Sequence, residues 1–465
     1  MKKEKLFIIS IDFDGAFDRV SRSVLIRKLS LFGAGTTFLL CLASIYLKTD
    51  NIIFQGNDQI TYSLYAGIKQ GLPLSPLLFL FYVNDIFDYF QSYHHSTNCI
   101  YELVHILMHA DDATIIASSR CLAVKKLDSL LRYCNKNCII PQYTKCEFIV
   151  INGKGTDFDP LPFGSEFLKN VPHTTLLGSQ LSSKGTLSED LKLHMEKRYP
   201  SCIKYYNYLR ANKLAPLSVK LKVLKACVVN SLLFNCETFG DCAPINLEKT
   251  YNKLLKCTFN VRSNTPTLIL YIESGFVPIK TLILARQLKF FNRFKEGLLT
   301  NSPRSLLFDR LMSEPSAFLR HYIAISGKYS SVEDIYKESN DQIKQKIHMF
   351  AGKPDKYKYN IYVDINPELK VSPFINIYHP LCKDIIRFRL GSHSLPIETG
   401  RWSGKKRPER LCEECGVLGD ERHIIYNCTR IDRNDIILPQ MLSEIWSTKG
   451  LFVLFSKLKN LQILD

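Results

Sequence analysis

The chain has 465 residues, of which 46% are hydrophobic and 11% aromatic; this excludes an intrinsically disordered protein and suffices for two or more domains. Lys and Arg number 61 against 44 Asp and Glu, so the formal net charge is +17 and we expect a polyanionic partner. Fifteen cysteines and no recognisable secretory leader favour a reducing intracellular compartment, nuclear or cytoplasmic, over a secreted disulfide framework.

The first predicted element is a buried strand. Leu6–Ile11 is an apolar, β-branched run that ends in Asp12. Asp14 and Asp18 follow at once, and the simplest role for both is that of a turn or helix-capping acid before a helix over residues 19–31.

Residues 29–47 form an uncharged stretch that is long enough for a membrane-spanning helix. Gly33, Gly35, Thr36 and Thr37 interrupt it. We therefore expect two helices packed on a soluble domain, with no membrane partner.

Two further segments carry candidate site residues. Residues 66–79 form a loop around Gln70 and Gly71, where glycine permits close backbone approach to a ligand. Residues 106–117 hold apolar runs on either side of Asp111 and Asp112, which predicts a tight hairpin with two carboxylates at its tip. Strands that deliver aspartates to the edge of an apolar sheet need cations, and two divalent metals that catalyse nucleotidyl transfer would satisfy this need.

Downstream of the hairpin, the sequence predicts further helices, a strand and a turn, and then a basic segment rich in tyrosine. Residues 125–135 have helical periodicity, residues 147–152 resemble a strand, and residues 176–178 predict a turn. A capping box at residues 186–189 begins a further predicted helix. Between Lys184 and Lys225, ten Lys or Arg residues stand against three acids, with four interleaved tyrosines: Tyr199, Tyr205, Tyr206 and Tyr208. This pattern favours a nucleic-acid surface, and the alternative is a solvated basic face with tyrosines in the core.

The strongest signal near the C-terminus is Cys412-x2-Cys415-x7-His423-x4-Cys428. Three thiolates and one imidazole form a soft ligand set that suits a structural, tetrahedral Zn²⁺ site. Basic residues surround it, and residues 405–408 also suit a nuclear-import patch. With fifteen cysteines in the chain, chance spacing remains the alternative.

Three of these segments together resemble motifs A, B and C of reverse transcriptases, and specifically those of non-LTR (LINE-type) retrotransposons. Motif A matches Asp12 through Ala16-Phe17-Asp18, motif B matches residues 70–79, and motif C matches Ala110-Asp111-Asp112. The residues at 395–402 and the cysteine–histidine knuckle behind them also resemble the non-LTR context.

The resemblance implies roles for individual residues. Asp12 and Asp111 would bind two Mg²⁺ ions, with Asp112 as a supporting catalytic acid. The carbonyl of Phe13 would complete the coordination, and Phe17 would exclude a 2′-hydroxyl; ordinary core packing is the alternative for Phe17. The remaining substrate-binding candidates are Gln70 and Gly71, beside the nucleotide and template, and Lys145. The lysine that the family carries after the hairpin is either displaced to Lys145 or missing.

The chain departs from the family in several places. It begins at Met1, close to Asp12, so the fingers region and any endonuclease domain that family members carry upstream are expected to be missing. His109 replaces an aromatic residue before motif C, and Leu72 occupies a position that is often polar.

We therefore predict an α+β right-hand polymerase palm, with an antiparallel sheet and helices on one face. The expected domains are a palm at 1–181, a helical thumb at 182–300, a helical or irregular connection at 301–400, a CCHC zinc knuckle at 401–435 and a helical tail at 436–465. The expected function is RNA-directed DNA polymerisation with an RNA template, a DNA primer and deoxynucleotides. The alternative is a catalytically inactive, truncated element product that only binds nucleic acid. An intron maturase or a telomerase-like polymerase ranks lower, because the knuckle behind the thumb suits a retrotransposon better.

Overall fold

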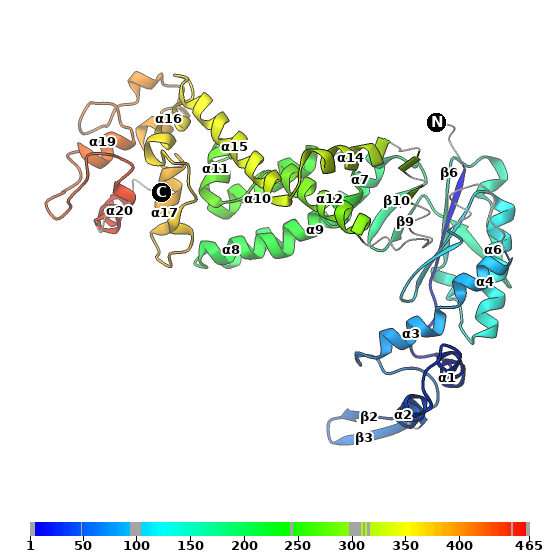
Figure 1. Cartoon of the computed structure of the whole chain (residues 1–465). Coiled ribbons are helices and arrows are strands. Elements are labelled where there is room, and N and C mark those ends of the chain that lie inside the picture. Colours follow the sequence, from blue (N-terminus) through cyan, green and yellow to red (C-terminus); the bar gives the residue numbers. More distant parts are fainter. Residues whose placement is uncertain are drawn as a thin grey trace. The chain divides into compact units, whose positions relative to one another are not determined.

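The computed structural model describes residues 5–47, 49–93, 104–241, 245–296, 308–309, 312–313, 317–447 and 450–461 (Figure 1). The chain divides into two compact units, residues 1–194 with 299–310 and residues 195–298 with 311–465. The boundary after residue 194 falls inside a helix, so the five-part division expected from the sequence, with its palm ending at residue 181, stays a prediction.

The first unit is built on a six-stranded sheet in the order β4-β5-β1-β6-β8-β7. Its strands are β1 (Leu6–Ile11), β4 (Ile106–His109), β5 (Asp112–Ala117), β6 (Glu147–Ile151), β7 (Leu161–Phe163) and β8 (Glu166–Asn170). Strand β1 is central and pairs antiparallel with both β5 and β6. The strands expected at 6–11 and near 147–152 are therefore confirmed.

One strand pair corrects the expectation of an antiparallel sheet. Strands β6 and β8 run parallel, and β7 then pairs antiparallel with β8. Parallel neighbours need a crossover of a dozen or more residues, and residues 152–165 supply it with the 3₁₀ helix η2 (Gly155–Phe158) and β7. The sheet is mixed, because this crossover brings β8 back in the direction of β6.

Helices α6 (Arg120–Lys136) and α4 (Ile86–Tyr93) cover one face of the sheet, as expected (Figure 1). Helices α1 (Arg22–Leu31), α2 (Thr36–Leu47) and α3 (Ser75–Val83) lie beyond one end of the sheet. Alternate residues of β1, Phe7, Ile9 and Ile11, share one hydrophobic core with Leu78 of α3 and Leu127 of α6. The two helices predicted within residues 29–47 and the helix predicted at 125–135 are confirmed.

Two hairpins and a 3₁₀ helix complete the first unit, and one of the hairpins contains the turn predicted at residues 176–178. Hairpin β2 (Thr49–Gln55) and β3 (Asp58–Leu64) connects α2 to the loop before α3. Hairpin β9 (His173–Leu176) and β10 (Ser179–Ser182) turns at Leu177 and Gly178, whose φ angles of 46° and 81° suit a two-residue type I′ turn. A short 3₁₀ helix, η1 (Tyr143–Lys145), precedes β6.

The second unit is helical. Its helices are α7 (Leu187–Ala211, which begins in the first unit), α8 (Leu217–Val223), the π-helix η3 (Leu224–Val229), α9 (Asn230–Leu232), α10 (Ile245–Phe259), α11 (Thr267–Ser274), α12 (Ile279–Glu296), α14 (Ala317–Lys328), α15 (Val332–Ala351), α16 (Tyr357–Ile365), α17 (Cys382–Arg389), α18 (Pro396–Thr399), α19 (Glu421–Tyr426) and α20 (Leu451–Asn460), with 3₁₀ turns η4 (Cys236–Thr238), η5 (Pro373–Ile375), η6 (Arg407–Glu409) and η7 (Ile445–Ser447). In the part of the chain described, no single helix is long and apolar enough to cross a membrane; the bent pair α11–α12 passes by length and composition.

A buried ion pair joins α11 to α17 in this unit. Glu273 and Arg389 are 0% and 4% exposed, and two Arg389 nitrogens donate to the Glu273 carboxylate at 2.6 and 3.1 Å. The Tyr362 hydroxyl donates to the same carboxylate at 2.9 Å. These hydrogen bonds satisfy both charged groups. Removal of either residue would leave the other buried without a counter-charge, which is destabilising.

We expect Glu273→Ala to lower the free energy of unfolding by about 3–5 kcal/mol, because it leaves Arg389 buried without a counter-charge. Urea denaturation followed by circular dichroism would measure the loss. The control is Glu338→Ala, which removes an exposed ion pair with Lys328 at 2.8 Å and should have little effect. Equal losses from the two substitutions would contradict this account.

Candidate active site and metal centre

Strand register brings the predicted aspartates to one end of the sheet. Ile11 lies opposite Ala113 in the β1–β5 ladder, so the next step along β1 sets Asp12 opposite Asp112. On the other side of β5, His109 lies opposite Asp112 across the β4–β5 hairpin. Ala110 and Asp111 form the two-residue turn, and Ala110 takes φ 53°, which is a strained angle for a residue with a side chain. The predicted hairpin with carboxylates at its tip is confirmed.

The three aspartates form a site of excess negative charge. Partial burial raises the pKa of Asp112 above its usual value, and the carboxylates of Asp111 and Asp12 raise it further. His109 acts in the opposite direction. Lys145 places Nζ 3.2 Å from Asp12 Oδ2, but its side chain is 63% exposed. These carboxylates are oxygen donors of the kind that hard divalent cations prefer, but in the described part of the chain their oxygen atoms are not already gathered into a ligand group.

The backbone around Asp12 is fixed by the segment before β6. The amide of Gln142 donates to the carbonyl of Asp12 at 2.8 Å, and the amide of Asp14 donates to the carbonyl of Ile140 at 2.8 Å. Phe13 lies between these bonds, in an isolated antiparallel bridge with Pro141. In such a pair the peptide groups of the middle residue face away from the partner segment, so the Phe13 carbonyl is directed to the side of β1 that carries the hairpin.

Cys146 also hydrogen-bonds to the backbone of Asp12, a role that the sequence did not indicate. Its Sγ accepts the Asp12 amide at 3.5 Å, and its thiol donates to the Asp12 carbonyl at 3.7 Å. Burial raises the pKa of Cys146 to about 11, so the thiol stays protonated and adds no charge beside Asp12. The only available signal was its position directly before a predicted strand, which does not identify a partner 134 residues away.

The loop before α3 docks on the segment that follows Asp12. The amide of Gly67 donates to the carbonyl of Val20 at 2.8 Å, and the amide of Ile68 donates to that of Phe17 at 2.9 Å. Gly67 has φ 84°, and a Cβ at this position would lie 2.6 Å from the carbonyl oxygen of Asp18. Only glycine permits this approach.

Asp18 holds the predicted substrate-binding glutamine. Gln70 Nε2 donates to both carboxylate oxygens of Asp18, at 3.0 and 3.1 Å. Asp14 and Asp18 both lie in the turn that precedes α1, which confirms the first of the two roles predicted for them. The cap of α1 is Ser21, whose hydroxyl accepts the amide of Val24, so neither aspartate caps the helix. Asp14 is a turn acid in an exposed ion pair with Arg19 at 2.6 Å.

The remaining predicted residues of this site lie on the same docked loop and segment. Phe17 is partly buried and stacks on Phe79 of α3, with ring centroids 4.9 Å apart. Gly71 follows Gln70 with φ 88°, and a Cβ at this position would meet no atom within 4 Å, so the surface here is open. The structure therefore gathers Asp12, Asp111, Asp112 and Lys145 at the end of the sheet, and Phe17, Gln70 and Gly71 on the loop docked beside Asp18.

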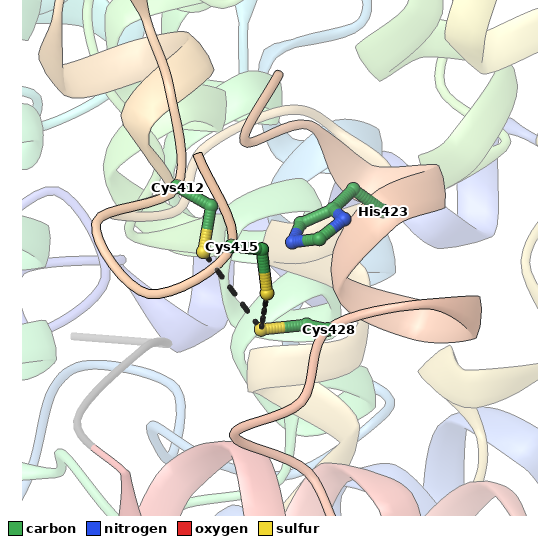
Figure 2. Close-up of side chains that lie close together, drawn as sticks. All are labelled: Cys412, Cys415, His423 and Cys428. Atoms are coloured by element: carbon green, nitrogen blue, oxygen red, sulfur yellow. Dashed lines mark hydrogen bonds between the residues drawn. The ribbon is translucent and has the colours of Figure 1, made fainter. Parts of the chain in front are cut away.

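In the second unit, Cys412, Cys415, His423 and Cys428 converge, and Figure 2 shows the four side chains pointing toward one another. Their ligand atoms all lie within 4.8 Å of one another. Cys428 Sγ is 3.9 Å from Cys412 Sγ and 4.0 Å from Cys415 Sγ. A tetrahedral site with metal–sulfur bonds of about 2.3 Å has sulfur–sulfur edges of about 3.8 Å, so these distances fit Zn²⁺.

The surroundings of the cluster lower the pKa of the Cys415 thiol, whereas burial and the two neighbouring thiols raise that of Cys428 to about 11. The hydroxyl and amide of Thr429 hydrogen-bond to Cys415 Sγ at 3.3 and 3.5 Å and lower the pKa of that thiol. His423 is buried, and its Nε2 has no hydrogen-bond partner in the described part of the chain. Gly416, with φ 67°, closes the tight turn that carries Cys412 and Cys415, and its amide donates to the Cys412 carbonyl at 2.9 Å. A buried ring nitrogen that faces three sulfurs is the arrangement that a structural zinc ion would complete.

Residues 1–183 match the family model of reverse transcriptases (RNA-dependent DNA polymerases). Among solved structures, the chain is similar to apo telomerase from Candida tropicalis, with 14% identity over 55% of this chain and 41% of that one, and a TM-score of 0.31. It is also similar to the Candida tropicalis and Candida albicans telomerases in complex with a fragment of telomeric RNA. Both are 12% identical, with coverage of 73% and 66% of this chain and 48% and 51% of those chains, and TM-scores of 0.33 and 0.30. The chain thus spans about half the length of these telomerases. By its family match, the chain carries a reverse transcriptase domain, of the RNA-dependent DNA polymerase family, in residues 1–183.

Proposed function

We propose that this chain is the RNA-directed DNA polymerase of a non-LTR retrotransposon, which extends a DNA 3′ end on an RNA template inside the cell. The observation that supports it most is the set of three aspartates at one end of the central strands, together with the loop of Gln70 and Gly71 that docks on the segment following Asp12. The amino-acid sequences of the three motifs and the Cys₃His cluster of the second unit support the non-LTR assignment.

Asp12 and Asp111 would hold two Mg²⁺ ions, with Asp112 and the Phe13 carbonyl in support. The bound ions would neutralise the negative charge of the triphosphate and lower the pKa of the primer 3′-hydroxyl. Cys146 and Gln142 fix the Asp12 peptide, so the first carboxylate is positioned before substrate binds. Lys145, exposed and 3.2 Å from Asp12, is placed to bind a substrate phosphate beside the carboxylates.

The docked loop would determine which nucleotide enters. Asp18 orients Gln70, and the open surface of Gly71 allows the nucleotide and template to approach the backbone. Phe17, braced by Phe79, would occupy the space that a 2′-hydroxyl needs.

We expect Phe17→Val to raise ribonucleotide incorporation relative to deoxynucleotide incorporation by at least about tenfold, a discrimination of about 1.4 kcal/mol. Single-nucleotide extension assays with matched ribo- and deoxynucleotides would measure the ratio. Phe87→Val is the control, because Phe87 is 48% exposed on α4. An unchanged ratio in the Phe17 variant would assign that ring to core packing alone.

Primer extension on poly(rA)·oligo(dT) with Mg²⁺ tests the polymerase. DNA synthesis that requires the RNA template and stops on chelation of Mg²⁺ supports the proposal. No extension under these conditions, with salt-sensitive RNA binding retained, favours the alternative of an inactive element product that only binds nucleic acid.

A further inference from the structure

We propose that a groove in the second unit binds the phosphate backbone of a single nucleic-acid strand, at a site independent of the catalytic aspartates. The groove has a volume of about 870 Å³ and lies among α7, α8, α10 and α17. It goes beyond the polymerase, because it requires neither a nucleotide nor Mg²⁺.

Five cationic side chains from four parts of the chain line this groove. Arg210 belongs to α7, Lys213 follows it, Lys220 belongs to α8, Lys253 to α10 and Lys383 to α17. Among the lining residues that the structure describes, none is acidic. The neighbouring Asp384 is already paired with Lys459 at 3.0 Å and lies 3.8 Å from Arg387.

Lys220 shows that the site is built into the fold. The residue is 5% exposed, and its Nζ donates to the carbonyl of Lys213 at 2.8 Å. A carbonyl satisfies a hydrogen bond but leaves the charge uncompensated, and a buried cation without an anion costs stability. Burial and the nearby Lys383 lower the pKa of Lys220, and burial and neighbouring cations also lower that of Lys383. A bound phosphodiester would relieve both effects.

The shape and the other lining groups favour a strand over a duplex. A concave groove accepts one extended backbone, whereas a duplex presents a convex surface to the protein. Tyr206 provides a ring face at the groove for a base, and Asn207 and Asn260 provide amide groups for sugar or base edges. Positive charge next to an aromatic ring is the usual arrangement for single-strand binding.

The test is fluorescence anisotropy of the full chain with oligonucleotides of about 12 nucleotides, without nucleotides or Mg²⁺. The probes are single-stranded RNA, single-stranded DNA and an RNA–DNA duplex, titrated at several salt concentrations. Lys213→Gln with Lys253→Gln removes two exposed groove cations, and Lys337→Gln with Lys346→Gln removes two exposed cations of α15 as a charge-matched control. We expect the groove variant to bind single strands at least about tenfold more weakly and to reduce the slope of log K against log salt by about 1.4, which the control variant should not do.

Each outcome supports or overturns the site. Equal losses with RNA and DNA identify the backbone as the ligand, and a loss with RNA alone adds recognition of the 2′-hydroxyl. A loss with the duplex alone, or equal losses in groove and control variants, would overturn the proposal. So would displacement of the strand by a polyglutamate peptide of equal charge at equal concentration, because the surface would then suit an acidic protein. Lys220→Met provides a second variant, which should weaken strand binding without lowering the melting temperature.

Discussion

Replacing Asp111 and Asp112 together with asparagine should lower primer extension by at least about 10³-fold, or about 4 kcal/mol in the activation barrier. The substitution keeps the size of both side chains but removes two negative charges from the end of the β4–β5 hairpin. Without them, Asp12 alone faces the substrate phosphates, and its nearest charged neighbour is the ammonium of Lys145. Quantitative extension assays on poly(rA)·oligo(dT) would measure the loss.

The same variant should be no less stable than the original chain when Mg²⁺ is chelated. Burial and the neighbouring carboxylates raise the pKa of Asp112 in the folded state, so its ionised form disfavours folding above that pKa. Asparagine removes this cost, as expected for a site that trades stability for function. Conversely, Mg²⁺ should raise the melting temperature of the original chain and leave that of the variant unchanged.

The matched control is Asp14→Asn, in the same segment as Asp12. Asp14 takes part in an exposed ion pair with Arg19, which contributes little to stability, so extension should change by less than about threefold. Extension that survives the Asp111 and Asp112 substitutions would show that the metal site lies elsewhere. A fall in extension accompanied by a fall in melting temperature would point to misfolding of the hairpin.

The elements that carry these aspartates were predictable because their signals are local. Strand β1 and the β4–β5 hairpin are short apolar runs with acids at their ends, and the spacing of Cys412, Cys415, His423 and Cys428 already implied a cluster. In each case, residues close in the sequence determine both the structure and the chemistry.

The supporting contacts were not predictable, because they depend on strand order and loop docking. Cys146 meets Asp12 only because β6 pairs with β1, and Asp18 meets Gln70 only because the loop before α3 docks across 52 residues of sequence. Strand β7 has three residues, too few to show a period, so the crossover that makes β8 parallel to β6 left no signal. The tyrosines of α7 illustrate the same limit: Tyr205 is 2% exposed in the core, whereas Tyr199 is 46% exposed.

Removing the zinc ligands should have the largest effect on the second unit. We expect the original chain to contain about one Zn²⁺, and Cys412→Ser with Cys415→Ser to abolish it. Structural zinc contributes about 10–16 kcal/mol in isolated fingers, and we expect at least about 3 kcal/mol of this in the stability of residues 396–436. Elemental analysis would measure the zinc content and thermal unfolding the loss of stability. A zinc chelator should cause the same loss of stability in the original chain.

The loss should spread beyond the four ligands, because the helix that carries His423 also carries a buried carboxylate. Glu421 of α19 is 1% exposed, accepts a hydrogen bond from Tyr357 of α16, and lies 2.9 Å from Nε2 of His393. If α19 loosens, this carboxylate loses both partners in a buried setting, which is costly. Limited trypsin digestion should then cleave at the basic residues 401–410, which precede Cys412.

Cys227→Ser is the control for thiol chemistry in general, because Cys227 is an exposed, free cysteine of η3. It should leave zinc content, melting temperature and trypsin resistance unchanged. Zinc content that persists in the Cys412 and Cys415 variant would rule out the cluster as the metal site. Zinc lost without a change in stability or in trypsin cleavage would show that Glu421 and its partners hold this region without the metal.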